Sequence, residues 1–585
     1  MTPLHWNRDA KHRRTSLLGR VRFGYNTVSL AQRDEICLRC RVPQSTTKSR
    51  REARSPKVTV PAILSGRHRM VSLDQRIGAM KKNYILDEQG YFWWHDEKYP
   101  NTQFAPEHHV TGWLKIADDG ELRLELDGML KDDQHPFAQF ADNVSSRRSP
   151  RPIQGITKKT GKKVLLIDAV ATGGQFRSNS FSFERYFATM CLVGDNAFVK
   201  NGKVPRFSQI EIDLTGFENW LRLGTLDVKR TKRVMKLQCD VVRDVVYNTE
   251  VGKLKFAKHT DVIEPNGLHR FEAKVREYMT LTFKRKSALS PEQVREEFGA
   301  LQDLMTLLTN SHFSLAWPTV QVSGSKKRFT FYFRRLTSSA SPPELHELCT
   351  NFFELRDSFG EIYAAWRTKR EAFGPGFFSY LSTRRDVNLY VENRFSNLVQ
   401  GMEFFHRTKH GAELPDTALQ DKVDRILADI TLAKDRKWLM RRLQHAAEPT
   451  LEQRLSAMFE SLPFDIDPQR LKSFAKACAD IRNDLAHFGG QRMRERSANF
   501  LQELSWKADA LGFFYHVTLL KETGLTNESI KAWLMPGLAT MHAREAMVQA
   551  GLMNREKVNT NRTVPRRADP PWTGSPTHCD AGIKA

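Results

Sequence analysis

The period of the hydrophobic pattern changes near residue 340, and this change limits the folds that the chain can adopt. From residue 80 to about 335, apolar and polar residues alternate along short stretches, as in half-buried strands. From about 345 to 545, apolar residues recur every three to four positions, as on the buried face of a helix. Strands followed by helices predict an α+β protein, in which a mostly antiparallel β-rich domain precedes a separate all-α bundle. We place these domains at 80–340 and 345–545.

Two segments of the β-rich part predict their elements in detail. Residues 110–130 predict a hairpin, because alternating apolar stretches flank the turn sequence at 118–120, Asp-Asp-Gly. A helix is predicted to begin after Ser290, with Pro291 in its first turn and Gln293 completing a capping box. The expected apolar stripe of this helix consists of Val294, Phe298, Leu301 and Met305.

The C-terminal part predicts a bundle of six or seven helices. The segments with helical periodicity are 344–359, 393–408, 419–430, 437–446, 451–462, 468–488 and 498–523.

The two ends of the chain lack any such pattern. The formal net charge is +24, and residues 1–79 hold 17 Lys and Arg against 5 Asp and Glu. Two explanations compete for this segment: a disordered basic arm that binds phosphates, or an upstream extension of a reading frame that starts at Met70 or Met80. We favour the extension, because the sequence changes abruptly at a methionine. Residues 546–585 are expected to be a disordered tail.

Cysteine usage and hydropathy indicate the compartment. Seven scattered cysteines do not predict a disulfide framework, so a reducing, cytoplasmic environment is expected. No apolar run is long enough to span a membrane. Cys37 and Cys40 lack a second ligand pair, and His406 and His410 are more typical of a helix end than of a metal site. We therefore expect no metal and no cofactor.

The sequence "ADIRNDLAHFGG" (residues 479–490) is the strongest candidate site. It ends a predicted amphipathic helix that opens at Asp467-Pro468 and stops at two glycines. Asn483 and His487 are four residues apart and share a face, while the long side chain of Arg482 can reach the same space. These groups suit phosphate chemistry, with a donor fork beside a protonatable imidazole. A solvated helix end explains them too, because Arg and His both complement the negative end of the helix dipole.

In this context, Arg–polar–x3–His at the end of a helix in a C-terminal bundle resembles the signature of the HEPN superfamily of nucleotide-binding and ribonuclease bundles. Residues 391–411 resemble an early helix of the ApeA-like HEPN subgroup. The segments "GYFWWHDE" and "VTGWLKIADDGELRLELDG", with "FERYFATMCLVGDNAF" and "IEIDLTGFENWL", resemble the N-terminal domain that accompanies it in ApeA-type phage-defence proteins. The resemblance covers residues 80 to 545.

The resemblance implies a metal-independent endoribonuclease of anti-phage defence, of the abortive-infection type, that cleaves cellular RNA such as tRNA and leaves a 2′,3′-cyclic phosphate. His487 is then the general acid or base, Arg482 stabilises the transition state, and Asn483 orients His487 or the phosphate. Glu392 and Arg394 line the site in the family manner, whereas Asp484 is expected to be a surface charge. The resemblance further implies a homodimer with a composite site, control by the N-terminal domain and a phage-derived trigger.

Two rival functions remain open at this stage. One is a non-catalytic HEPN domain that binds RNA or mediates assembly, although the presence of both Arg482 and His487 argues against it. The other is a basic DNA-binding regulator, which the charge of +24 favours. Much of that charge lies in residues 1–79, and no helix-turn-helix pattern stands out.

Overall fold

The computed structural model describes most of the chain between residues 83 and 555. The described ranges are 83–96, 104–130, 149–175, 182–198, 203–263, 274–338, 340–385, 389–411, 417–443, 448–488, 498–534 and 540–555. These ranges belong to one compact unit, residues 79–585. The expectations for residues 1–79, including Cys37 and Cys40, and for 556–585 lie outside the described residues.

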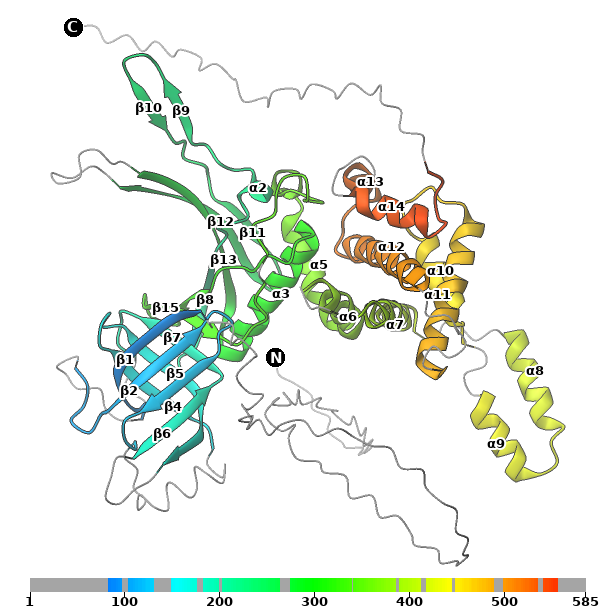
Figure 1. Cartoon of the computed structure of the whole chain (residues 1–585), viewed down its shortest axis with the longest axis horizontal. Coiled ribbons are helices and arrows are strands. Elements are labelled where there is room, and N and C mark those ends of the chain that lie inside the picture. The colour runs from blue at the N-terminus through cyan, green and yellow to red at the C-terminus, as the bar shows by residue number, and fades with distance from the viewer. Residues whose placement is uncertain are drawn as a thin grey trace, which may run out of the picture. The chain divides into compact units, whose positions relative to one another are not determined.

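The strands precede all but two of the helices (Figure 1). The strands are β1 (Tyr84–Trp94), β2 (Val110–Ala117), β3 (Leu122–Leu126), β4 (Arg151–Thr157), β5 (Lys163–Gln175), β6 (Phe183–Ala188), β7 (Met190–Gly194), β8 (Phe207–Asp213), β9 (Asp227–Arg230), β10 (Met235–Gln238), β11 (Val245–Asn248), β12 (Gly252–Ile263), β13 (Lys274–Leu289), β14 (Thr319–Val322) and β15 (Arg328–Phe333).

Two helices lie among the strands and the others follow them. The helices are α2 (Glu218–Leu221), α3 (Pro291–Thr309), α4 (Phe352–Leu355), α5 (Phe359–Ala372), α6 (Gly374–Arg384), α7 (Val391–His410), α8 (Thr417–Ala428), α9 (Ala433–Leu443), α10 (Leu451–Glu460), α11 (Pro468–Phe488), α12 (Ala498–Glu522), α13 (Asn527–Leu534) and α14 (Met541–Gln549).

The described strands other than β9 and β10 form one antiparallel sheet that closes on itself at one end, and β9 and β10 pair separately. The strands β5, β4, β1, β2, β3 and β6 pair in that order, and β6 pairs again with β5, so that they form a barrel. Apolar side chains such as Leu114, Leu124 and Leu166 fill this barrel and are fully or almost fully buried. From β5 the sheet continues through β7, β15, β14, β8, β13, β12 and β11. The predicted antiparallel β-rich region followed by a helical region is thus confirmed.

The hairpin predicted at residues 110–130 is present as β2 and β3. Leu114 lies opposite Leu124 in the register, and both are buried. The turn places Gly120 at φ 79°, and a Cβ at this position would lie 2.0 Å from the backbone oxygen of Phe333. A glycine is therefore required here both for its positive φ and for the close approach of the chain after β15.

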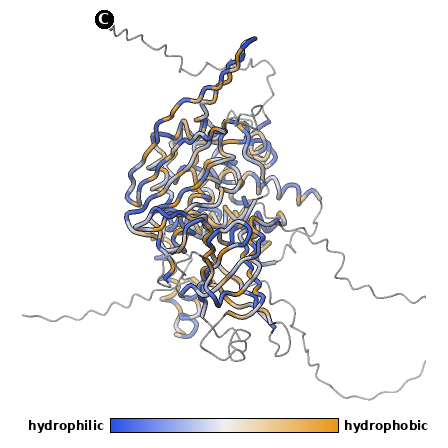
Figure 2. The backbone as a smooth tube through the Cα atoms, turned by 90° about the vertical axis from the view of Figure 1, so that its left-hand side faces the viewer, coloured by the Kyte–Doolittle hydropathy of each residue, from blue (hydrophilic) through white to orange (hydrophobic). Residues whose placement is uncertain are grey.

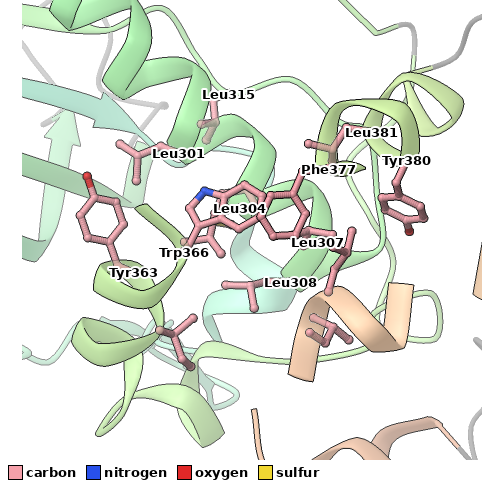
Figure 3. Close-up of a cluster of buried hydrophobic side chains, with 14 of the residues drawn as sticks. Leu301, Leu304, Leu307, Leu308, Leu315, Tyr363, Trp366, Phe377, Tyr380 and Leu381 are labelled. Carbon is pink, nitrogen blue, oxygen red and sulfur yellow. The ribbon is translucent and has the colours of Figure 1, made fainter. Parts of the chain in front are cut away.

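The predicted helix after Ser290 is also confirmed, and it is the centre of the larger core. Ser290 caps α3 and completes the expected capping box with Gln293. The apolar side of α3 packs against α5 and α6, with Trp366 among leucines of α3 and Phe377 beside it (Figure 3). The same core cluster continues into β8, β13 and α12. One core therefore spans the region around 340–345, where the sequence places a domain boundary.

The predicted helices differ from the observed ones in three places. Residues 344–359 were predicted to form one helix, but only the short α4 forms within them before α5 begins at Phe359. The helices α5 and α6 were not predicted, and Gly374-Pro375-Gly376, a sequence typical of a turn, lies at the start of α6. Pro375 occupies the first turn of α6, where its missing N–H costs nothing. The helices α13 and α14 were also missed, and α14 continues past residue 545, where a disordered tail was expected to begin.

Hydropathy follows this architecture. Hydrophobic and hydrophilic stretches follow one another closely along the backbone (Figure 2). Among the described helices, none combines the length and the apolarity needed to cross a membrane.

His516 links α12 to α3 and gives the fold an expected pH dependence. Its Nε2 donates to the backbone oxygen of Leu307 at 2.8 Å. Burial, with a smaller contribution from the positive charge of Arg384, lowers the pKa of His516 to about 4. The unfolded chain, with a His pKa of about 6.5, therefore binds more protons between about pH 6.5 and 4. Stability is fully present above this window and is lost as the pH falls through it.

Replacing His516 with glutamine is expected to reduce the loss of stability between pH 6.5 and 5 by about 2 kcal/mol. Urea unfolding of both proteins at the two pH values measures this difference. The exposed His346 provides the matched control, since His346→Gln is expected to leave the pH dependence unchanged. Equal pH dependence in the parent and His516→Gln proteins would show that His516 is not buried in the neutral form.

Candidate functional site

The helix α11 carries the predicted motif in its last two turns. The Asp467 carboxylate accepts a hydrogen bond from the backbone N–H of Gln469 at 3.0 Å, so the helix opens as its sequence predicts. Its buried side consists of Leu471, Phe474, Ala475 and Cys478, with Ile481 and Leu485 partly buried. This packing fixes the orientation of α11, at whose C-terminal end the motif lies. Gly489 and Gly490 lie outside the described residues.

Arg482 is held between a neighbouring residue and a second helix. Its Nη1 donates to Oδ1 of Asn483 at 3.1 Å, and its Nη2 lies 3.3 Å from Oε2 of Glu403 on α7. The Arg482 side chain is 27% exposed and that of Glu403 is 18% exposed. The guanidinium is thus oriented by two acceptors but still reaches solvent, so an incoming anion could contact it.

His487 is exposed one helical turn beyond Asn483. The exposed side chains of Asn483 and His487 share a face of α11, as the i, i+4 spacing predicts. The structure therefore brings Arg482, Asn483 and His487 to one solvent-facing end of the helix. Exposed imidazole and guanidinium groups at one helix end are both able to contact a phosphate.

Further charged side chains surround Glu403 at the adjoining ends of α7 and α10. Arg407 lies 3.2 Å from Glu403 and 2.5 Å from Glu448, and Glu448 in turn lies 3.2 Å from Arg454. Nη1 of Arg454 is 3.3 Å from Nδ1 of His406. We refer to Glu403, Arg407, Glu448, Arg454 and Arg482 as the ion-pair cluster. Its alternating charges connect α7, α10 and α11 beside the motif.

Glu403 is the residue that the sequence prediction missed. Its position on α7 is fixed by close packing, because a Cβ at Gly401 would lie only 2.7 Å from Cβ of Ser379 on α6. The available signal was the sequence "GMEFFHRTKH", in which Glu403 and Arg407 have the spacing of a helical ion pair. That spacing does not show which second arginine Glu403 contacts.

Glu392 and Arg394 were predicted to line the site, but the structure places them elsewhere. Glu392 precedes Glu403 by eleven residues on α7, which is about 16 Å along a helix that rises 1.5 Å per residue. Nη1 of Arg394 lies 2.6 Å from Oδ1 of Asp509 on α12, and Asp509 also contacts His542. Both residues therefore belong to the opposite end of α7.

Asp484 is buried, not a surface charge as predicted. Its exposed fraction is 6%, and neither carboxylate oxygen has a hydrogen-bond partner in the part of the chain that the structure describes. A buried carboxylate without donors destabilises a fold.

Replacing Asp484 with asparagine is therefore expected to raise the free energy of unfolding by about 1–3 kcal/mol, because a neutral amide costs less to bury than a carboxylate. Urea unfolding near neutral pH measures the change. Asp480→Asn, an exposed position one turn earlier on α11, serves as the matched control. A lower free energy of unfolding for Asp484→Asn would mean that the carboxylate has a stabilising partner.

Within the described ranges, no group of three or more His, Cys, Asp or Glu side chains is arranged to hold a metal ion. The rings of His406 and His410 stack with their centroids 4.4 Å apart.

Comparison with known proteins gives two matches to protein families. A family model described as ApeA N-terminal domain 1 matches residues 87–366, past the boundary placed near 340. A model described as Apea-like HEPN matches residues 396–529, which include Glu403 and the motif but exclude Glu392 and Arg394. No curated protein and no solved structure gives a match. The two families occur in the order expected from the sequence and together span most of the chain, which therefore belongs to the ApeA-like HEPN family of anti-phage effectors.

Proposed function

We propose that this protein is a metal-independent endoribonuclease that cleaves cellular RNA, such as tRNA, during anti-phage defence in the cytoplasm. HEPN domains are generally ribonucleases. The observation that carries the proposal is the placement of Arg482, oriented by Glu403 and Asn483 at the same exposed helix end as His487. These groups supply a charge stabiliser and a proton-transfer group without any cofactor.

In the proposed reaction, the 2′-oxygen of a ribose attacks the adjacent phosphorus as its proton passes to a base. The bond from phosphorus to the 5′-oxygen breaks, and that oxygen receives a proton. The products are a 2′,3′-cyclic phosphate and a 5′-hydroxyl. His487 would act as base or acid, and the Arg482 guanidinium would bind the non-bridging oxygens, on which negative charge increases in the transition state.

One imidazole cannot stand on both sides of the phosphorus at once. A second copy of α11, related by a two-fold axis, would supply the other proton-transfer group and make the site composite. We therefore expect a homodimer whose interface includes the exposed end of α11. Light scattering on the purified chain measures the mass.

Cleavage of total bacterial RNA in excess EDTA tests the proposal. Fragments with cyclic phosphate and 5′-hydroxyl ends are expected. Intact RNA together with measurable RNA binding would instead support a non-catalytic binding module. Cleavage that occurs only in phage-infected cells would show a nuclease that stays latent until a trigger arrives, as expected if the N-terminal domain restrains it. Preferential binding to duplex DNA without turnover would favour the regulator.

Glu403→Gln is expected to lower the turnover number for RNA cleavage by about tenfold, because an amide holds the Arg482 guanidinium less firmly than a carboxylate. The Michaelis constant should change little, since Glu403 does not contact RNA in this proposal. Steady-state cleavage of a labelled RNA measures both constants. Glu460→Gln, an exposed position on α10, is the matched control. Unchanged turnover in Glu403→Gln would remove Glu403 from the site.

A further inference from the structure

A second charged site lies in the region matched by the N-terminal family model. A pocket of about 280 Å³ lies between one face of α3 and the segment that follows β15. Arg295, Phe298 and Gln302 line it from α3, and Arg334 and Arg335 line it from the other side. At Gly299 the wall is open, because a Cβ built there would meet no atom within 4 Å.

The charge of this pocket is strongly positive. Its lining contains Arg295, Arg334, Arg335 and Arg385 together with His312, and none of the lining residues is acidic. Arg385 forms an ion pair with Asp303, which is buried behind the pocket. Within the part of the chain that the structure describes, no ion pair forms at Arg295, Arg334 or Arg335. Several guanidinium groups therefore converge on a small space without balancing carboxylates.

Arg335 is the least exposed of these uncompensated arginines. Its Nη1 donates to the backbone oxygen of Leu315 at 2.7 Å, and its guanidinium lies 3.7 Å from the ring centroid of Trp317. The Nε atom is buried without a hydrogen-bond partner among the described residues. Burial lowers the pKa of Arg335 to about 10, so the group remains charged at neutral pH. This half-buried cation, held by stacking and one carbonyl, lacks the anion that would complete its hydrogen bonding.

We propose that this pocket binds a small phosphate-bearing ligand. Guanidinium groups form paired hydrogen bonds with phosphate oxygens, and the hydroxyls of Ser314 and Ser338 add further donors. Phe298 and Phe333 supply an apolar wall for an organic portion of the ligand. The volume is close to the lower end, roughly 300 Å³, of the range for small-molecule sites. It suits a mononucleotide or a smaller phosphate compound but not a folded nucleic acid.

The pocket also contacts the helical part of the chain. Arg385 directly follows α6, and Arg384 donates to the backbone oxygen of Asn310 after α3 at 2.9 Å. The helix α6 packs on α7, which carries Glu403. A phosphate in the pocket would compete with Asp303 for Arg385 and so act on the junction between α3 and α6.

Isothermal titration of the full chain with ATP, AMP, inorganic pyrophosphate and adenosine tests the site without depending on ribonuclease activity. We expect the phosphorylated compounds to bind and adenosine not to bind. Affinity for pyrophosphate equal to that for ATP would assign the binding to phosphate alone. Tighter binding of ATP would add a contribution from the organic portion.

Two variants locate the binding. Arg295→Gln combined with Arg334→Gln removes two exposed charges and is expected to weaken binding at least tenfold. Gly299→Leu fills the pocket from a helical position without changing any charge, and it should weaken binding similarly. Arg243→Gln, at an exposed position remote from the pocket lining, should bind as the parent does.

Three results would overturn the proposal. These are the absence of binding by every phosphorylated compound at millimolar concentration, equal binding of adenosine, and parental affinity in both pocket variants. The last result would move any observed binding to another site, such as the end of α11.

Discussion

Replacing Arg482 or His487 with alanine is expected to lower RNA cleavage by at least about 100-fold, because each supplies a separate part of the transition-state stabilisation. The loss of His487 removes a proton-transfer group. The loss of Arg482 removes the positive charge beside the phosphorane. Cleavage of a labelled RNA in EDTA, followed as single-turnover rates, measures both effects. Arg482→Lys should also be impaired, since a lysine cannot form the paired hydrogen bonds of a guanidinium.

The controls for these variants come from the same chain. Arg470→Ala changes another arginine of α11, which precedes Arg482 by twelve residues and donates to Asn554. His346→Ala removes an exposed histidine from another region. Both should retain parental activity. If His487→Ala retained full cleavage while Arg482→Ala lost RNA binding, the helix end would be an RNA-binding surface and the proton-transfer group would lie elsewhere.

The motif could be found in the sequence because its residues lie within one and a half turns of a single helix. Local spacing then determines which side chains share a face, and α11 has the predicted amphipathic packing. Glu403 could not be found in this way, because its contact with Arg482 joins residues 79 positions apart. Asp484 was misplaced for a related reason. Its polar neighbours suggested exposure, whereas the packing around α11 buries it.

The fold shows the same division between local and distant information. The β2–β3 hairpin and the cap of α3 depend on a few adjacent residues and were predicted correctly. Closure of the barrel depends on the pairing of β6 with both β3 and β5, which no local pattern encodes. The helices α5 and α6 were not predicted; Gly374 and Pro375 are typical of a turn, while the packing of Trp366 and Phe377 sustains the helices on both sides.

Trp366→Ala is expected to lower the free energy of unfolding by about 4 kcal/mol, the cost of a large cavity in a packed core. Trp366 is fully buried, and its Nε1 donates to the backbone oxygen of Ala300 at 2.8 Å. Such a loss is a large share of the roughly 5–15 kcal/mol that stabilises a typical protein. Urea unfolding measures it. Trp438→Ala on α9 removes an exposed tryptophan and should change stability by less than about 0.5 kcal/mol.

The same variant tests whether strands and helices unfold together. The core around Trp366 includes side chains of α3, α5 and α6 and continues into β13 and α12. If this core acts as one cooperative unit, Trp366→Ala should accelerate amide hydrogen exchange in β13 and in α12 by similar factors. Faster exchange in α12 with unchanged protection in β13 would show that the β-rich and helical regions are separately stable domains, as the sequence alone predicted. A shared unit would allow a ligand bound beside α3 to alter the helices that carry Arg482, because both would depend on the same packing.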